Sequence, residues 1–326
     1  MQADPAAGFA GNTSGVGMLS VVIPALNERE AIVDTVKRVH AVLTEAKIEP
    51  FEVIVVDDGS NDGTGDLARE AGAVVVRHPH NVGYGRSLKD GITAARYPAI
   101  AITDADGTYP IEDIPKLYAM YGEGYDMVVG ARTGKFYKES IIKSPLRWVL
   151  RSIVEWTAGR KIPDINSGLR IFHRDLTISH FNHLCDTFSF TTSMTLAYMM
   201  KGRFVGYRPI DYFQRIGKTR VRLFRDSIRT LQYVVEACVY FNPLKIFTLL
   251  AFLCGLMGVA SFAAGVGFKI VTLFWLGIGC GLMSIVVFSL GLVCVLLKQI
   301  MDRPNRAYAA DRMGDVVPLS ERQRRA

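Results

Sequence analysis

The chain has 326 residues, of which 49% are hydrophobic, and it carries a formal net charge of +7. Its mean hydropathy is positive and its long apolar runs lie in the last third, which excludes an ordinary soluble globular protein. The five cysteines show no paired spacing, so the sequence predicts neither a disulfide framework nor a zinc site.

Short apolar runs alternate with helix-like segments over the first two thirds of the chain. Residues 1–17 contain no Lys or Arg and no apolar core of signal-peptide length, so they are expected to form a flexible tail. The apolar runs follow at residues 19–23, 51–56, 73–77, 99–103 and 126–131. This alternation predicts an α/β domain with a mostly parallel sheet that is covered on both faces.

Polar residues follow three of these runs, and the carboxyl ends of parallel strands meet at one edge of a sheet. The three segments are Pro24-Ala25-Leu26-Asn27-Glu28, Asp57-Asp58-Gly59-Ser60 and Asp104-Ala105-Asp106. Asp104 and Asp106 are suited to hold a hard divalent cation together with a diphosphate. On its own, an Asp-x-Asp pair is more typical of a capped turn.

The last third predicts membrane association. Residues 221–243 place apolar side chains at three-to-four spacing opposite Arg222, Arg225 and Arg229, which is typical of an interfacial amphipathic helix. Residues 246–266 and 270–297 contain no charged residue, and each run is long enough to cross a hydrocarbon core of about 30 Å. Residues 244–298 are therefore expected to form a transmembrane hairpin.

Basic residues flank this hairpin on both sides, whereas Lys269 stands alone in its turn. The positive-inside rule then predicts a multi-pass protein of the cell membrane with both termini in the cytoplasm, including a basic tail at residues 299–326. The same clustering indicates that the positive charge meets anionic lipid, and nucleic acid is not expected as a partner.

Five motifs occur in a fixed order along residues 19–220. They are Val22-Ile23-Pro24-Ala25-Leu26-Asn27-Glu28, Asp57-Asp58-Gly59-Ser60, Asn81-Val82-Gly83-Tyr84-Gly85, Asp104-Ala105-Asp106-Gly107 and Asn166-Ser167-Gly168-Leu169-Arg170. In this order they resemble family 2 glycosyltransferases, whose GT-A fold is a Rossmann-like α/β domain, here expected over residues 18–220. Within the family the chain is similar to membrane-anchored dolichyl- and polyprenyl-phosphate sugar synthases, the dolichol-phosphate mannose synthase group.

The resemblance implies a set of site residues. It assigns the nucleotide sugar to Pro24, Leu26, Glu28, Asp57, Asp58 and Ala105, with Asp58 in direct contact. It assigns Mg²⁺ or Mn²⁺, and catalysis, to Asp104 and Asp106. The family commonly has Gln where this chain has Thr108, so the third ligand position stays open.

Several cations complete the expected site. The resemblance gives Arg132 and Arg170 a catalytic role on phosphate, because a forked guanidinium suits phosphate oxygens. Four further cations are expected to meet the phosphate of the acceptor or of the diphosphate: Arg147, Arg215, Lys218 and Arg220. The histidines, His78 among them, lack acidic or cysteine partners at ligand spacing, so they are expected to have packing or surface roles.

The implied reaction is inverting transfer of a hexose, mannose or glucose, from a GDP- or UDP-hexose to polyprenyl phosphate at the cytoplasmic membrane face. A phosphate monoester has a second pKa of about 6 and arrives already nucleophilic, so this reaction needs no general base. A homo-oligomer stays an open possibility.

Two alternatives remain at this point. A hydroxyl acceptor, on a glycolipid or polysaccharide, would need a base, for which Asp164 is the candidate. The other alternative is a catalytically silent membrane scaffold of the same fold.

Overall fold

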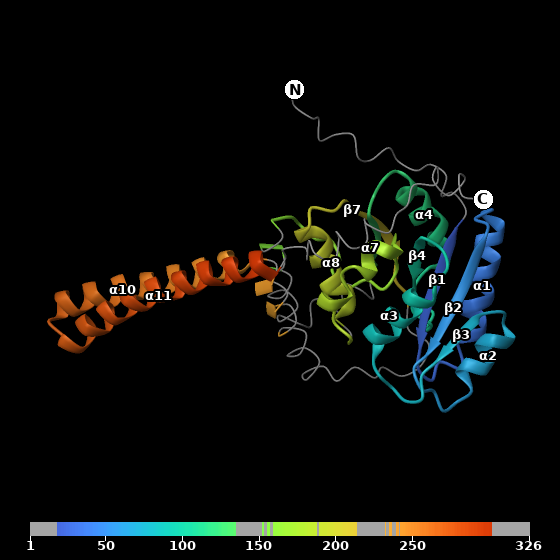
Figure 1. Ribbon diagram of the computed structural model, residues 1–326, viewed down its shortest axis with the longest axis horizontal. Coiled ribbons are helices and arrows are strands. Elements are labelled where there is room, and N and C mark those ends of the chain that lie inside the picture. The colour runs from blue at the N-terminus through green and yellow to red at the C-terminus, as the bar shows by residue number, and fades with distance from the viewer. Residues whose placement is uncertain are drawn as a thin grey trace, which may run out of the picture. The chain divides into compact units, whose positions relative to one another are not determined.

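The computed structural model describes residues 18–134, 159–187, 189–213 and 242–301, and between them the single residues 152, 155, 156, 232, 235, 236, 239 and 240. Contacts divide the chain into two compact units, Met1–Cys238 and Val239–Ala326, and Figure 1 labels most of their elements. The predicted tail at 1–17 lies outside the described residues, and the predicted interfacial helix and basic tail lie mostly outside them. The boundaries drawn there remain predictions.

The first unit is built on a mixed sheet of seven strands in the order β3-β2-β1-β4-β6-β5-β7. β6 runs antiparallel to its neighbours β4 and β5, and the other pairs are parallel. The predicted α/β class with a mostly parallel sheet is therefore confirmed. The strands are β1 Leu19–Ala25, β2 Phe51–Asp57, β3 Val74–Arg77, β4 Ala99–Ile102, β5 Met127–Thr133, β6 Arg170–His173 and β7 Val205–Asp211.

The order of the strands reverses beside β1. From β1 the chain continues to β2 and β3 on one side, and β4 then returns to the other side of β1. Every residue of β1 is buried, as expected for a central strand rich in Val and Ile with helices on both faces. Ligands of open α/β sheets bind outside the carboxyl ends of the strands at such a reversal, which points to the ends of β1 and β4.

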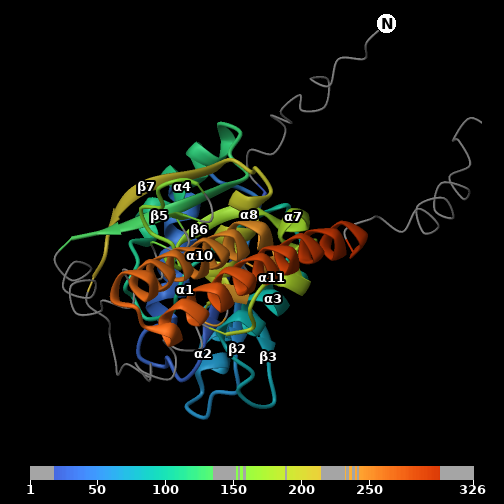
Figure 2. The same ribbon diagram turned by 90° about the vertical axis from the view of Figure 1, so that its left-hand side faces the viewer.

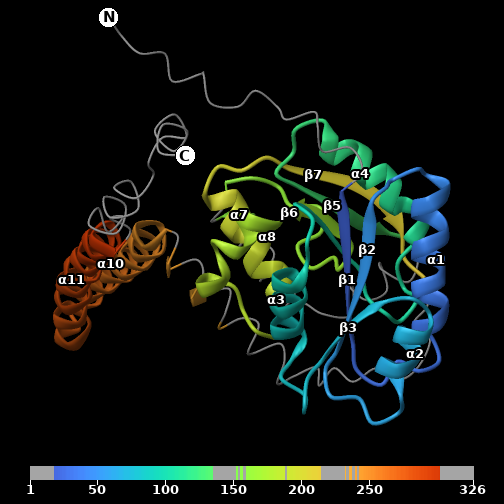
Figure 3. The ribbon, with the colours of Figure 1, turned by 45° about the vertical axis from the view of Figure 1, so that its right-hand side comes forward.

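Helices cover both faces of this sheet (Figure 3). α1 directs Ile32, Val36, Val39 and Leu43, at three-to-four spacing, into the core on one face. On the other face α3 lies close against the sheet at Gly91. The helices of this unit whose bounds lie in the described residues are α1 Ile32–Glu45, α2 Thr64–Glu70, α3 Tyr84–Ala94, α4 Ile114–Gly122, α7 Arg174–Ile178 and α8 Phe190–Met200, with short 3-10 turns η2 Ile111–Asp113 and η3 Phe181–His183.

Among its described residues, the second unit has two long apolar helices, α10 Pro243–Phe268 and α11 Val271–Met301, that lie side by side (Figure 2). Both are long and apolar enough to cross a membrane, and the predicted spans lie within them except for the first residue of the second span. Asn242 caps α10 by accepting a hydrogen bond from the backbone of Lys245, and Lys269 ends it in the left-handed conformation with φ of 58°.

Glycine and serine hold the two apolar helices together. A Cβ added at Gly265 or Gly277 would collide with the backbone of Phe274 or Phe262, respectively. Ser284 Oγ donates to the carbonyl of Ala251 at 2.7 Å. Small residues at an interface let helix backbones approach closely, which is how helices associate in lipid.

Candidate active site

The loops after β1 and β2 are tied to each other at the rim of the sheet. Asn27 donates its backbone N–H to Ser60 Oγ at 2.9 Å, and its side-chain oxygen accepts the backbone N–H of Asn61 at 2.8 Å. The Glu28 backbone donates to Thr64 Oγ1 at 3.0 Å. These bonds fix the segment that carries Pro24, Leu26 and Glu28, of which Pro24 is buried and the other two are partly exposed.

Asp57 and Asp58, at the end of β2, are both buried, and each accepts hydrogen bonds from backbone N–H groups. Asp57 Oδ1 accepts the N–H of Ser60 at 2.9 Å. Asp58 accepts the N–H of Val82 at 2.9 Å and that of Gly83 at 3.0 Å, one on each carboxylate oxygen. Asp58 therefore shapes the loop that leads into α3, and its expected direct contact with a nucleotide remains a prediction.

Asp104 and Asp106 emerge directly after β4. Asp104 Oδ1 accepts a hydrogen bond from the Tyr84 hydroxyl at 2.9 Å. Asp106 Oδ1 accepts from both the backbone N–H and the hydroxyl of Thr108, at 3.1 and 2.6 Å. Ala105, between them, points its side chain into the core. In this arrangement the Thr108 hydroxyl orients the Asp106 carboxylate.

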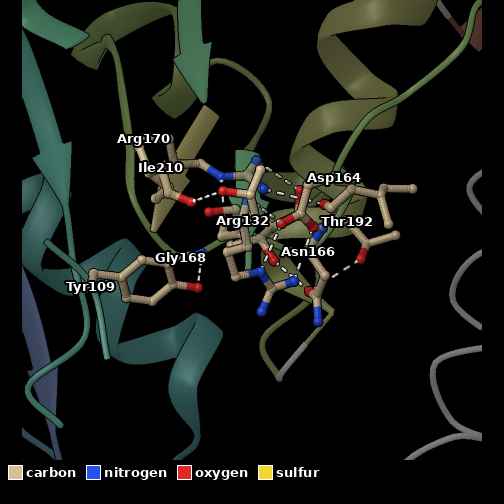
Figure 4. A network of polar contacts seen from close by, with 12 residues as sticks. Tyr109, Arg132, Asp164, Asn166, Gly168, Arg170, Thr192 and Ile210 are labelled. Carbon is tan, nitrogen blue, oxygen red and sulfur yellow. Dashed lines mark hydrogen bonds and ion pairs between the residues drawn. The ribbon is translucent and has the colours of Figure 1, made fainter. Parts of the chain in front are cut away.

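Arg132 and the buried carboxylate of Asp164 form a two-point ion pair (Figure 4). Arg132 Nε donates to Oδ2 at 2.7 Å and Nη2 to Oδ1 at 2.9 Å, while the backbone N–H of Arg132 also reaches Oδ2 at 3.1 Å. Burial alone would raise the pKa of Asp164, but hydrogen bonds and charge from Arg132 outweigh it and hold that pKa below its ordinary value. The guanidinium carbon lies 5.3 Å from the centre of the Tyr212 ring.

Arg170, at the start of β6, is fully buried and binds carbonyl oxygens (Figure 4). Its Nε donates to the Ser167 carbonyl at 2.9 Å and its Nη2 to the Ile165 carbonyl at 3.2 Å. Its Nη1 donates to the Thr191 carbonyl and to Thr195 Oγ1, each at 2.9 Å. Arg170 thus holds the loop before β6 against α8, and its expected role on phosphate remains a prediction.

Residues 20–181 match the family model described as Glycosyl transferase family 2. They form a family 2 glycosyltransferase domain. The expectation drawn from the five motifs is thereby confirmed, and the sheet described above is the fold of this domain.

Two relatives of this chain come from Haloferax volcanii. One is named low-salt glycan biosynthesis hexosyltransferase Agl6 and is 31% identical over 82% of this chain, a match that spans 65% of the relative, just under two thirds of its length. The other is named dolichyl-phosphate hexose transferase and is 27% identical over 68% of this chain and 94% of its own.

A solved structure of glucosyl-3-phosphoglycerate synthase from Mycobacterium tuberculosis, in complex with Mn²⁺, uridine diphosphate and phosphoglyceric acid, has a similar fold. The TM-score is 0.57 at 19% sequence identity, and the match covers 69% of this chain and 80% of that one. A likeness at this identity concerns the fold, so the chemistry of the present domain has to be argued from its own residues.

The carboxylate ligands that the glycosyltransferase domain offers suit a hard divalent cation. Among the described residues, no cluster of three or more His, Cys, Asp and Glu side chains could hold a metal ion. Mg²⁺ is usually bound by one or two carboxylates, with phosphate oxygens of the substrate and water filling the other positions. Asp104 and Asp106 supply two carboxylates at the reversal of strand order, which suits Mg²⁺ or Mn²⁺ held jointly with a diphosphate.

Sequence reasoning missed two tyrosines of this domain. Tyr84 donates to Asp104, and Tyr109 accepts the backbone N–H of Gly168 at 2.7 Å (Figure 4). Burial raises the pKa of both phenols well above the ordinary value, so both stay protonated. Tyr84 lies within one of the five motifs, a signal that could have found it, whereas nothing near Tyr109 in the sequence points to Gly168.

Four predicted phosphate-binding cations lie outside the described residues of the glycosyltransferase. They are Arg147, Arg215, Lys218 and Arg220.

Proposed function

We propose that this protein is an inverting glycosyltransferase that moves a hexose from a GDP- or UDP-linked donor to polyprenyl phosphate at the cytoplasmic face of a membrane. The family 2 domain makes it a glycosyltransferase. The relative named dolichyl-phosphate hexose transferase and the two apolar helices support a lipid phosphate as the acceptor. Mannose and glucose are the proposed sugars.

The ion pair of Arg132 with Asp164 is the observation that carries the choice of acceptor. A hydroxyl acceptor must lose a proton to a base, and Asp164 was the candidate. Both of its oxygens accept hydrogen bonds from Arg132, and its lowered pKa makes it a weak base. A phosphate acceptor needs no proton removed, because its second pKa is about 6.

Asp104 and Asp106 are proposed to bind the diphosphate of the nucleotide sugar. A Mg²⁺ or Mn²⁺ ion, when bound, would neutralise the charge that builds up on the departing diphosphate. The two carboxylates would hold that ion beside the diphosphate, while the loops of β1 and β2, with Leu26, Glu28 and Asp57, receive the nucleoside. A phosphate oxygen of the acceptor forms the new bond to the anomeric carbon as the bond to the departing nucleoside diphosphate breaks, and this single in-line displacement inverts that carbon.

The acceptor phosphate is proposed to meet the cations that precede the first apolar helix. Arg215, Lys218 and Arg220 lie at the carboxyl end of the expected domain, before that helix in the sequence, and Arg147 lies earlier. Charge-assisted contacts to phosphate are strong. Replacing Arg215 and Arg220 with Ala should raise the KM for polyprenyl phosphate in detergent and leave the KM for the donor unchanged. An unchanged acceptor KM would leave these residues the role of electrostatic anchors only.

The orientation in the membrane is proposed from charge. Basic residues flank α10 and α11 on both sides, whereas the turn carries only Lys269, which favours cytoplasmic termini. A reporter inserted at the turn should be accessible from outside the cell, and a reporter at either terminus only from the cytoplasm. The reverse pattern would overturn this orientation.

A transfer assay tests the proposed function. The purified full-length protein is given radiolabelled GDP- and UDP-hexoses, one at a time, with polyprenyl phosphate or with glycolipid and oligosaccharide acceptors. The proposal expects label in an acid-labile lipid product with one donor, and none with the Asp106→Asn variant. Label on a hydroxyl acceptor would establish the alternative chemistry, and no label under any condition would favour the silent scaffold.

A further inference from the structure

Asp104 is held between two neighbours from distant parts of the chain. On one side the Tyr84 hydroxyl, from the first residue of α3, donates to Oδ1 at 2.9 Å. On the other side Gly168 lies so close that an added Cβ would be 3.0 Å from Oδ2 and 3.1 Å from Oδ1. The hydrogen bond from Tyr84 sets the rotation of this carboxylate, and Gly168 leaves just enough space for it.

The backbone of Tyr84 is fixed in turn from the nucleotide side of the rim. Asp58 accepts the N–H groups of Val82 and Gly83, the two residues before Tyr84. Gly83 has a φ of 109°, a conformation that other residues rarely adopt, so the turn into α3 depends on glycine here. The Asp58 carboxylate therefore fixes the backbone from which the side chain of Tyr84 extends.

His78 connects Asp58 to the body of α3. Its Nδ1 lies 2.9 Å from Asp58 Oδ1, and its Nε2 lies 3.2 Å from Asp90 Oδ2. Arg86 Nε in turn donates to Asp90 Oδ2 at 2.8 Å. The histidine is mostly buried between the two carboxylates, and among the described residues its ring is hydrogen-bonded to Asp58 while Nε2 only lies near Asp90.

The first turn of α3 also packs against the backbone of Cys185 and Asp186. The backbone N–H of Arg86 donates to the carbonyl of Asp186 at 3.0 Å. An added Cβ at Gly85 would collide with the carbonyl of Cys185. With Asp58 on one side and this segment on the other, Tyr84 can move little without breaking several contacts.

From these contacts we propose that Tyr84 is a positioning residue for the metal-binding carboxylate Asp104, and that it links this carboxylate to Asp58 in the nucleotide pocket. The inference rests on the proposed metal-dependent transfer. Groups that hydrogen-bond to ligating carboxylates orient them, and their loss typically lowers metal affinity or activity by about 10- to 100-fold. Tyr84 makes such a contact through a single hydroxyl.

Mn²⁺ binding to the full-length protein in detergent, measured by electron paramagnetic resonance with and without uridine diphosphate, tests this role. Tyr84→Phe removes only the hydroxyl and should raise the Kd for Mn²⁺ about 10-fold or more. Tyr207→Phe is the matched control, because the Tyr207 hydroxyl is buried and has no hydrogen-bond partner among the described residues. That control should leave the Kd unchanged. If Tyr84→Phe does not fold, Tyr84→Met makes the same test.

A double-mutant cycle tests the link to the nucleotide pocket. Asp58→Asn should weaken Mn²⁺ binding when Tyr84 is present and have little further effect in Tyr84→Phe, since contacting groups of one network are not additive. A folded Tyr84→Phe variant with wild-type Mn²⁺ affinity would overturn the positioning role, and additive effects would overturn the link. Both are read from Mn²⁺ binding, so a failure of lipid transfer alone would count against the proposed function and not against Tyr84.

Discussion

Arg132 donates two side-chain hydrogen bonds to the Asp164 carboxylate, which is only 2% exposed. A buried charge that loses its partner is costly, so the pair has consequences for stability as well as for the choice of acceptor.

Asp164→Asn should lower the free energy of unfolding by about 3–5 kcal/mol at neutral pH, because it leaves the charge of Arg132 without its partner. The folded pKa of Asp164 lies below its unfolded value of about 3.9, so the stabilisation is complete above that pH. It is lost as the pH falls through the folded pKa. Thermal unfolding of wild type and variant should therefore converge at acid pH.

Glu52→Gln provides the control for that measurement. Glu52 is also buried, and it pairs with Arg96 at 2.8 Å and accepts from Ser20 at 2.6 Å, at the amino end of β2. Its loss should lower stability without changing the relative use of phosphate and hydroxyl acceptors. If both variants altered acceptor use alike, the effect would reflect general destabilisation.

Thr108→Val should reduce Mn²⁺ affinity and transfer about 10-fold, because it removes a hydroxyl that orients Asp106 from 2.6 Å. Asp106→Ala and excess chelator should abolish transfer while the protein stays folded. Thr93→Val is the matched control, since the Thr93 hydroxyl is exposed and donates to the Lys89 carbonyl within α3. Full transfer in chelator would contradict the metal role of this loop.

Arg170→Met should destabilise the glycosyltransferase domain by about 3 kcal/mol or more, because it leaves buried carbonyl oxygens without donors. The loss should be visible in thermal unfolding without any substrate. Arg69→Met, at an exposed pair with Asp66, should change stability by no more than about 0.5 kcal/mol. A fully stable Arg170→Met variant that lost only transfer would instead support the predicted role of Arg170 in binding phosphate.

Gly91→Ala should lower the free energy of unfolding by about 1–3 kcal/mol through overpacking. An added Cβ would overlap the side chains of Val22 and Val56, where α3 meets the sheet. Gly122→Ala, at the end of α4, is the contrast, because nothing lies within 4 Å of the added atom. Alanine favours helix over glycine by up to about 1 kcal/mol, so this variant should be neutral or more stable.

The sequence was most informative where local pattern decides structure. Apolar runs such as the one that forms β1 predicted β1 to β5 to within a few residues, because a strand buried on both faces must be apolar throughout. The spans were predicted from length and composition and lie inside α10 and α11 except for the first residue of the second span. β6 and β7 were not predicted, and the direction of β6 is set by its neighbours.

Contacts between side chains that are far apart in the sequence were harder to predict. Arg132 follows a strand and resembles a phosphate ligand, yet its guanidinium meets Asp164, 32 residues later, which no local pattern indicates. His78 was assigned a packing role, and its position between Asp58 and Asp90 follows only once β3 and α3 are placed. The sequence offered the residue types of the site, and the packing of the sheet determined which of them meet.

The antiparallel pairing of β4 with β6 has a consequence for engineering. Ile102 pairs with Arg170, so the segment that ends in Asp104 and Asp106 and the one that brings in Gly168 and Arg170 are joined by sheet hydrogen bonds. The register of this pairing sets the spacing between the two segments. A slip of one residue would turn every side chain of β6 to the opposite face of the sheet, so any redesign of β4 or β6 has to keep this register.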